Sequence, residues 1–222
     1  MNNQTTISTE TLAFLKQIEN NNNKPWFDEN KKQWEAVKEN YSLFMGELQE
    51  KIKEIDAIVF KEPKKYMSRI NRDIRFSVDK SPYRNNIFSL IERGSSENSP
   101  KFYLQIQPGN NSFIACGLWS PDSATLKKVR TEIMHSSDEL FTIIKKESFI
   151  NYFGTISGET LSRPPQGFDA DSPNLELLKL KQYIVKKTFT DKEILLDSLN
   201  DELVKAYKEV LPFLEFLEQS IE

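Results

Sequence analysis

The sequence is poor in the residues that build most metal sites and disulfides. Among its 222 residues there is one cysteine, Cys116, and one histidine, His135. A single cysteine excludes an intrachain disulfide and a thiolate metal cluster, and a single histidine removes most zinc sites. Cys116 lies in an apolar run, which favours a buried thiol, and His135 lies at what reads as a helix end, which favours an exposed or capping role. We therefore expect neither a metal nor a cofactor.

Long apolar runs and glycine-rich motifs are lacking as well. No run approaches the roughly 18 apolar residues of a membrane-spanning helix, and residues 1–8 lack the basic and apolar regions of a secretion signal. We expect a cytoplasmic protein with no membrane partner. The seven glycines are scattered without the spacing of a phosphate-binding loop, and no Gly-x-Ser-x-Gly motif occurs. Nucleotide hydrolysis by the common route and serine-nucleophile chemistry are therefore disfavoured.

Internal repeats, low-complexity tracts and Pro/Gly/Ser linkers are missing too, so we expect a single domain over residues 1–222. Apolar residues spaced three and four apart predict a helical part at 1–60, with a short helix around Leu12–Ile18 and a long one after Pro25. Residues 61–119 are expected to be mainly strands because apolar and polar residues alternate there.

Residues 120–222 read as helices plus one strand. The strand is expected at 183–189, and Thr190 and Glu193 have the spacing of a capping box that opens a final helix. Pro212 is expected to kink or end that helix. Further strands are predicted at 68–77, 86–91, 102–107 and 112–119. Together these elements predict an α+β fold: a central antiparallel sheet with a long N-terminal helix, a long C-terminal helix and shorter helices packed around it.

Basic charge is concentrated in one segment. The chain has 23 lysines but only seven arginines, and four of the seven fall between Arg69 and Arg84. Residues 61–84 carry eight basic and three acidic side chains, a local charge of +5 in a chain whose net charge is −3. Lysine would serve solubility alone, whereas a planar guanidinium is preferred where a carboxylate or phosphate is held by two parallel bonds. The segment therefore reads as a site with strict geometry.

On the predicted strand at 68–77, alternate residues project to opposite faces. One face carries Arg69, Asp73 and Arg75, close enough for the aspartate to pair with either arginine and for the rest to contact a ligand. Arg72 projects from the other face, among apolar neighbours. A charge there is costly unless it is paired, so Arg72 is expected to be structural and to contact a buried carboxylate or backbone carbonyls.

The turn around Pro82 can bring Lys80 and Arg84 back over a ligand held by the strand. Interleaved arginine and aspartate can equally form a cross-strand salt-bridge network without any ligand, and the sequence does not decide between the two. Aromatic residues such as Tyr83 could stack on nucleobases, but the acidic remainder of the chain would repel a long polyanion. We do not expect binding of extended nucleic acid.

Four groups of residues resemble the successive motifs of one family. They are residues 22–27 (NNKPWF), 69–83 (RINRDIRFS running into DKSPY), 117–121 (GLWSP) and 161–168 (LSRPPQGF). The pattern covers nearly the whole chain and is similar to that of the bacterial proteins grouped as domain of unknown function 2461. The resemblance implies a single domain and brings no known activity, cofactor or catalytic residue. It adds Trp119 and Arg163 as side chains of a type that can line a pocket.

Three functions remain open. The leading prediction is a binding module for a small anionic ligand, a phosphate or carboxylate compound. Its expected ligand-binding residues are Arg69, Asp73, Arg75, Lys80, Tyr83, Arg84, Trp119 and Arg163. The alternatives are a metal-assisted phosphoesterase or nuclease-like enzyme with Asp73 or Asp79 as acid, base or metal ligand, and a protein-interaction domain in which the arginine cluster is a structural salt-bridge network. Whether the chain is an enzyme, and its oligomeric state, are not predicted.

Overall fold

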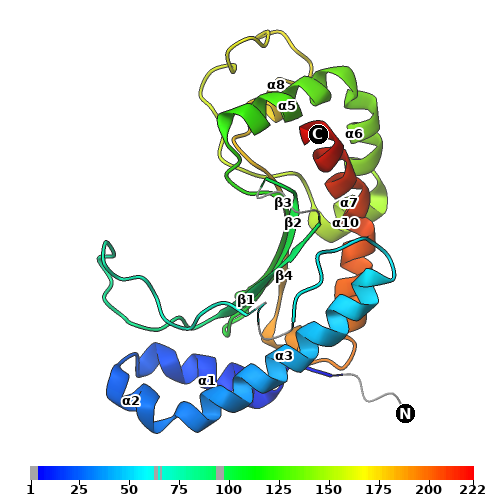
Figure 1. Cartoon of the computed structure of the whole chain (residues 1–222). Coiled ribbons are helices and arrows are strands. Elements are labelled where there is room, and N and C mark those ends of the chain that lie inside the picture. The colour runs from blue at the N-terminus through cyan, green and yellow to red at the C-terminus, as the bar shows by residue number, and fades with distance from the viewer. Residues whose placement is uncertain (1–4, 63–64, 66, 94–97) are drawn as a thin grey trace. The chain divides into compact units, whose positions relative to one another are not determined.

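The computed structural model describes residues 5–62, 65, 67–93 and 98–222 (Figure 1). The chain divides into two compact units, and each takes in three separate segments. Unit 1 comprises Met1–Ile91, Tyr103–Ile114 and Thr188–Lys205, and unit 2 comprises Glu92–Phe102, Ala115–Lys187 and Ala206–Glu222. The single domain expected from the sequence stays a prediction.

Four strands form one antiparallel sheet, which confirms the predicted α+β class. The strands are β1 (Ile87–Glu92), β2 (Lys101–Ile106), β3 (Ser112–Leu118) and β4 (Tyr183–Phe189), and they lie in the order β1-β2-β3-β4. Four of the five strands predicted from the sequence are therefore present, within a residue or so at each end.

Burial alternates along β1, β2 and the first part of β3, as expected for strands that cover a core on one side only. One face carries buried side chains such as Ile87, Leu104 and Ile114. The opposite face carries half-exposed side chains, among them Phe88 and Tyr103. The sheet thus has one face that is accessible in part to a ligand.

Unit 1 contains α1 (Thr9–Asn20), α2 (Lys24–Glu29), α3 (Lys31–Lys53), α9 (Asp191–Ile194) and the first residues of α10 (Leu199–Ile221). The long N-terminal helix predicted after Pro25 is confirmed as α3, but it begins at Lys31, because Asn30 separates the short α2 from α3 and its side-chain Nδ2 donates to the carbonyl of Trp26 at 2.8 Å. The capping box of Thr190 and Glu193 is confirmed, but it opens only the short α9.

Helix α3 packs its apolar stripe into the core of unit 1. Val37, Phe44 and Leu48 are buried at spacings of seven and four residues, the pattern of one helix face. Tyr41 on the same face is fully buried, and its hydroxyl donates to Ser89 Oγ of β1 at 2.9 Å. This bond satisfies a polar group that would otherwise be costly to bury.

The turn between β2 and β3 is held by α9. The Asp191 carboxylate accepts from the backbone N–H groups of Gly109 and Asn110, each at 2.9 Å, and Asn110 Oδ1 accepts from Asp191 N at 2.8 Å. Gly109 and Asn110 have φ values of 80° and 61°, a region that these two residue types adopt more readily than others. The segment 188–205 therefore packs with the β2–β3 turn as part of unit 1.

Unit 2 contains α5 (Ser123–His135), α6 (Ser137–Ile144), α7 (Glu147–Phe153), α8 (Leu175–Leu178) and the rest of α10. Arg130 on α5 is buried, and its guanidinium donates to the carbonyls of Leu178 (Nε, 2.7 Å) and Leu180 (Nη2, 3.0 Å). Pro212 lies inside α10 and does not end it.

Within the part of the chain that the structure describes, no helix combines the length and apolar character needed to cross a membrane.

Strands β3 and β4 approach each other closely at Gly117. The residue has φ 128°, and a Cβ at this position would lie 2.0 Å from the carbonyl oxygen of Tyr183. We expect Gly117→Ala to lower the free energy of unfolding by about 3 kcal/mol or more, because the clash adds to the strain of a positive φ. Urea denaturation measures this loss.

Gly154→Ala is the matched control. Gly154 also has a positive φ, 70°, but a Cβ there would meet nothing within 4 Å. Because Gly154 has ψ −120°, outside the left-handed helical region, its substitution is expected to cost about 1 to 3 kcal/mol from backbone strain alone, less than Gly117→Ala, which adds the clash. Equal losses in the two variants would contradict a steric role for the close approach at Gly117.

Candidate functional site

The segment at 68–86, called the basic loop from here on, is an irregular loop and not a strand. Its two limbs pair through Arg84 N to Ile70 O (2.8 Å) and Arg72 N to Pro82 O (2.9 Å), and the one bridge is Asn71 with Tyr83. The strand predicted at 68–77 is therefore wrong. Apart from Ser68, whose N–H donates to Phe88 O of β1 at 2.9 Å, the segment pairs with its own returning limb, where Pro82 has no N–H to donate, so no continuous ladder forms. In Figure 1 it is the teal trace that leads into β1.

The returning limb is anchored at Tyr83. Asn22 Nδ2 donates to the carbonyl of Tyr83 at 2.8 Å, and Tyr83 N donates back to Asn22 Oδ1 at 2.9 Å. The ring of Tyr83 stacks on Phe27 with a centroid distance of 4.1 Å, and only 7% of the residue is exposed. Tyr83 was predicted as a ligand-binding residue, but its contacts are those of an anchor for the loop.

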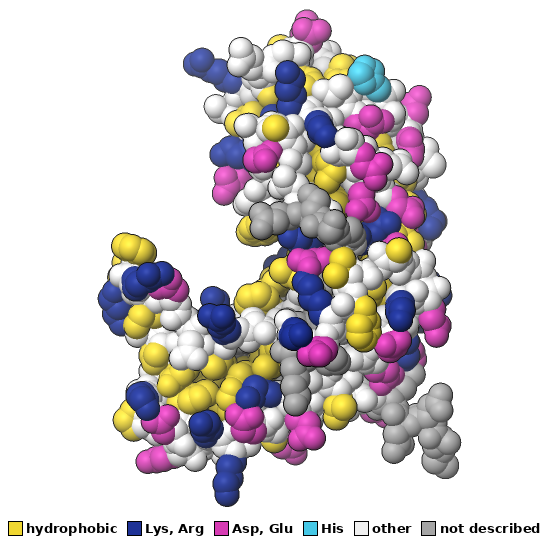
Figure 2. All heavy atoms as spheres, in the orientation of Figure 1, with side chains coloured by type: hydrophobic (Ala, Val, Ile, Leu, Met, Phe, Trp, Pro, Cys, Tyr) yellow, Lys and Arg dark blue, Asp and Glu magenta, His cyan; other side chains and the backbone are white. Residues whose placement is uncertain are grey.

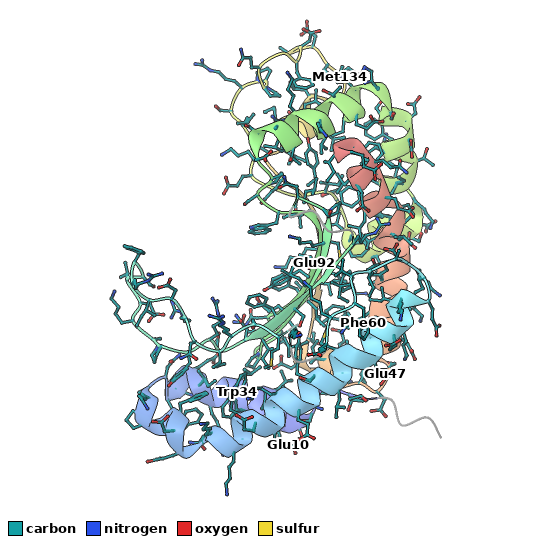
Figure 3. The ribbon with its side chains drawn as sticks, in the orientation of Figure 1. Glu10, Trp34, Glu47, Phe60, Glu92 and Met134 are labelled. Atoms are coloured by element: carbon teal, nitrogen blue, oxygen red, sulfur yellow. The ribbon has the colours of Figure 1, made fainter. Side chains whose placement is uncertain are left out.

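The anchor belongs to an aromatic cluster built by α1, α2 and α3. Phe14 of α1 lies 5.7 Å from Trp26, 6.4 Å from Phe27 and 5.9 Å from Trp34, measured between ring centroids. Trp34 is labelled on α3 in Figure 3. Asn23 caps α2 by accepting from Trp26 N at 3.0 Å, so the asparagines before α2 serve both the helix and the loop.

Arg72 is paired within the basic loop. It forms an ion pair with Asp79 and donates to the carbonyl of Ser81 at 3.3 Å, with 26% of its side chain exposed. The predicted contact with a backbone carbonyl is present, but the carboxylate partner is 60% exposed instead of buried, and Arg72 lies among polar loop atoms and not in an apolar face. The pKa of Asp79 is held well below its ordinary value by hydrogen bonds from Ser81, and further by Arg72.

Two of the predicted ligand-binding cations, Arg75 and Lys80, also bond to partners inside the basic loop. Arg75 donates to both carboxylate oxygens of Asp73, Nε to Oδ1 at 2.9 Å and Nη2 to Oδ2 at 2.6 Å, and these bonds lower the pKa of Asp73. Lys80 Nζ donates to the carbonyl of Ile74 at 2.9 Å. The aspartate–arginine pairing that the sequence predicted is therefore present, and it uses the planar fork of Arg75.

Arg69 and Arg84 differ from these residues. Among the described residues, neither guanidinium has an ion pair or a hydrogen bond to another side chain. The Arg84 guanidinium lies over the ring of Phe88, 5.7 Å from its centroid. Arg69 is exposed and lies between Ser68, whose N–H bonds to Phe88 O, and Ile70, whose carbonyl accepts from Arg84 N. The two cations therefore flank the same end of β1.

Sequence reasoning missed the half-exposed face of the sheet beside Arg84. Phe88 of β1, Tyr103 of β2 and Phe113 of β3 form an aromatic row, with centroid distances of 5.3 and 5.4 Å. Tyr103 Oη donates to Gln105 Oε1 at 2.7 Å, and Gln105 Nε2 donates to Gln107 Oε1 at 2.7 Å. The alternation of these residues was visible in the sequence, but which face would be covered was not.

Tyr103 stays a neutral hydrogen-bond donor near neutral pH. Burial raises the pKa of Tyr103 to about 12, while the nearby positive charge of Arg84 lowers it. The Arg84 guanidinium lies 5.7 Å from the centroid of Phe88, and that ring lies 5.3 Å from Tyr103, so the cation and the aromatic row are close together within unit 1.

The tip of the basic loop exposes two apolar side chains. Phe76 and Val78 have relative exposures of 96% and 101%, respectively. Figure 2 shows apolar side chains in yellow next to basic side chains in dark blue on this loop. Large apolar groups that are fully exposed on a loop commonly mark a contact with another molecule.

The remaining predicted site residues belong to unit 2. Trp119 follows β3 directly and is 74% exposed, and Ser120 after it has φ 45°. Arg163 is exposed in the irregular segment between α7 and α8. Trp119 and Arg163 belong to unit 2 and the basic loop belongs to unit 1, so the candidate site is built from residues of unit 1 alone. Among the described residues, no three His, Cys, Asp or Glu side chains form a group that could hold a metal ion.

The bonds of Asn22 predict how easily the basic loop opens. Asn22→Ala removes both bonds to the Tyr83 backbone, so trypsin should cleave after Arg72, Arg75 or Lys80 about tenfold faster than in the wild type. Limited proteolysis followed by mass spectrometry measures the rate and the sites. Asn21→Ala is the control, because the Asn21 side chain bonds only within α1, to Gln17 O at 3.0 Å. Equal acceleration in both variants would rule out the anchor.

The titration of Asp79 tests the pairing inside the loop. Because the pKa of Asp79 lies below its unfolded value near 3.9, the pair stabilises the loop above about pH 4 and is lost as pH falls through the folded-state pKa. Arg72→Ala should raise this pKa only in part, since the bonds from Ser81 remain. Carbon-detected NMR of the carboxyl group follows the change. An unchanged pKa in the variant would show that Arg72 does not contact Asp79 in solution.

Comparison with known proteins agrees with the motifs seen in the sequence. The family model described as conserved hypothetical protein (DUF2461) matches residues 10–216, which include the basic loop, its anchor and the aromatic row. No curated protein and no solved structure matches the chain. Because the match extends over nearly the whole sequence, the chain belongs to the DUF2461 family of conserved hypothetical proteins.

Proposed function

We propose that the protein is a binding module for a small anionic ligand, a phosphate or carboxylate compound, held by Arg69 and Arg84. The observation that carries this proposal is the position of the Arg84 guanidinium over the Phe88 ring, 5.7 Å from its centroid, with no carboxylate partner among the described residues. An arginine stacked on an aromatic ring keeps its N–H edge available for a bidentate bond to an anion.

The ion pairs inside the basic loop support this choice among the predicted cations. The Nε and Nη2 groups of Arg75 both donate to the Asp73 carboxylate, and Lys80 donates to a backbone carbonyl. An anion that bound either residue would have to displace these partners. Arg69 and Arg84 need no such exchange. The paired cations hold the loop in shape, and the excess positive charge of residues 61–84 raises the local concentration of anions.

A second candidate function is contact with another protein through the tip of the basic loop. It is favoured by the full exposure of Phe76 and Val78, which a site for a small anion does not require. In that case the ion pairs within the basic loop would only hold the loop in the conformation that exposes Phe76 and Val78. The two candidates differ in what a small anion does to the protein.

Titration with inorganic phosphate tests the anion site. Calorimetry is expected to give saturable binding by the wild type, and Arg69→Ala combined with Arg84→Ala should weaken it at least tenfold, because two charge-assisted contacts are lost. Phosphate should also raise the melting temperature of the wild type but not of this variant. Sodium chloride at matched ionic strength separates site binding from screening.

Two further variants serve as controls. Lys31→Ala combined with Lys32→Ala removes the same charge from exposed positions at the start of α3 and should leave binding within about twofold. Asp73→Ala combined with Arg75→Ala removes the loop pair without changing net charge, so it should weaken binding less than the Arg69 and Arg84 variant, because it loosens the loop but removes no contact to the anion. If phosphate neither binds nor raises the melting temperature, while the arginine variant is destabilised, the cluster is a structural network and the anion site is rejected.

A further inference from the structure

We infer that the ligand of this module is a nucleoside monophosphate, whose planar base lies on the aromatic row of Phe88, Tyr103 and Phe113 while its phosphate binds Arg84. The inference rests on the anion-binding function proposed above and adds the organic part of the ligand.

The aromatic row is a stack of three overlapping rings, because centroids only 5.3 and 5.4 Å apart are too close for rings that lie side by side in one plane. Its three rings come from three neighbouring strands and are tilted by only 30° and 31° from one ring to the next. They project from the half-exposed face of the sheet, which is normally polar in an antiparallel sheet covered on one side. Every nucleobase has a π face that stacks on such rings.

Polar side chains bound the row along β2 and the turn that follows. Tyr103, Gln105 and Gln107 lie on one face at alternate positions, so the apolar surface gives way to amides within two residues. A protein partner that covered the sheet would have to match these amides as well, whereas a single base needs only one ring face to stack on. The occupant is therefore small and flat.

The amides are ordered in a way that suits the edge of a base. Gln105 Oε1 accepts from Tyr103, and Gln107 Oε1 accepts from Gln105 Nε2 at 2.7 Å and from Asn86 Nδ2 at 3.4 Å. Because each amide oxygen in this series of hydrogen bonds accepts, the Nε2 group of Gln107 has no acceptor among the described residues. Glutamine amides recognise the donor and acceptor pattern of base edges in nucleic-acid complexes.

The charge distribution favours a ligand with a single phosphate over a long polyanion. Arg84 lies at the Phe88 end of the row, so a phosphate bound there would be joined to a base on the neighbouring rings. The net charge of the chain is −3 although residues 61–84 carry +5, so the rest of the surface repels a long polyanion. One nucleotide fits this arrangement, and an extended strand does not.

The test compares probes that separate the base from the phosphate. Calorimetry with the full chain uses the four nucleoside 5′-monophosphates, adenosine, ribose 5-phosphate and inorganic phosphate. We expect at least one monophosphate to bind about tenfold or more tightly than ribose 5-phosphate, since the base adds stacking to the phosphate contact. Adenosine without its phosphate should bind more weakly than its monophosphate.

Variants then assign the base to the row. Tyr103→Leu keeps an apolar side chain but removes the central ring, so it should weaken monophosphate binding about tenfold and leave ribose 5-phosphate unchanged. The unchanged probe shows in the same variant that the protein is folded. Gln107→Leu should reduce the preference among the four bases.

Phe60→Leu is the matched control. Phe60 also belongs to unit 1, is 47% exposed and has a cation over its ring, Lys53 Nζ at 5.3 Å, but it lies outside the aromatic row, beyond the end of α3 (Figure 3). Its substitution should leave every affinity unchanged. A loss of monophosphate binding in Phe60→Leu as large as in Tyr103→Leu would overturn the assignment to the row.

The outcomes separate this inference from the proposed function. If ribose 5-phosphate and phosphate bind but no monophosphate binds more tightly, the anion site stands and the nucleotide assignment is overturned. If no probe binds, both are overturned. A single-stranded oligonucleotide that binds more tightly than every monophosphate would overturn the choice of a mononucleotide.

Discussion

The amide of Asn22, which contacts both polar backbone atoms of Tyr83, is the constraint on which the basic loop depends. With the N–H donating at 2.9 Å and the carbonyl accepting at 2.8 Å, and with the Tyr83 ring stacked on Phe27, the returning limb has one position on α2. The residue that follows is Arg84. The same contacts that order the loop therefore set where this guanidinium lies above β1.

The cations of the basic loop fall into two sets, those bonded to partners within the loop and those without such partners. Most of its cations are neutralised within the loop by nearby carboxylates or carbonyls, in contacts that are exposed and individually weak. Among the described residues, the guanidinium groups of Arg69 and Arg84 have no ion pair, so they can bind another molecule. Fixing the geometry with one set of side chains leaves the other set preorganised, which lowers the entropy lost when a ligand binds.

Local patterns in the sequence predicted much of the fold, and the site depended on contacts that such patterns do not contain. The β2–β3 hairpin and the capping box at Thr190 were found because their signals lie within a few residues. The strand expected at 68–77 had the right alternation but lacks a neighbouring strand to pair with. The anchor joins Asn22 to a residue 61 positions away, and the aromatic row required knowing which sheet face α3 covers.

The make-up of unit 1 also constrains how the chain folds during synthesis. Its last segment, Thr188–Lys205, carries Asp191, which holds the turn at Gly109 from about 80 residues further along. During synthesis, the edge of β3 has no partner until β4 at Tyr183–Phe189 has been made, and the turn has no anchor until Asp191 follows. Nascent chains that stop before residue 183 therefore lack both β4 and the anchor of the hairpin, and we expect them to aggregate through the open edge of β3.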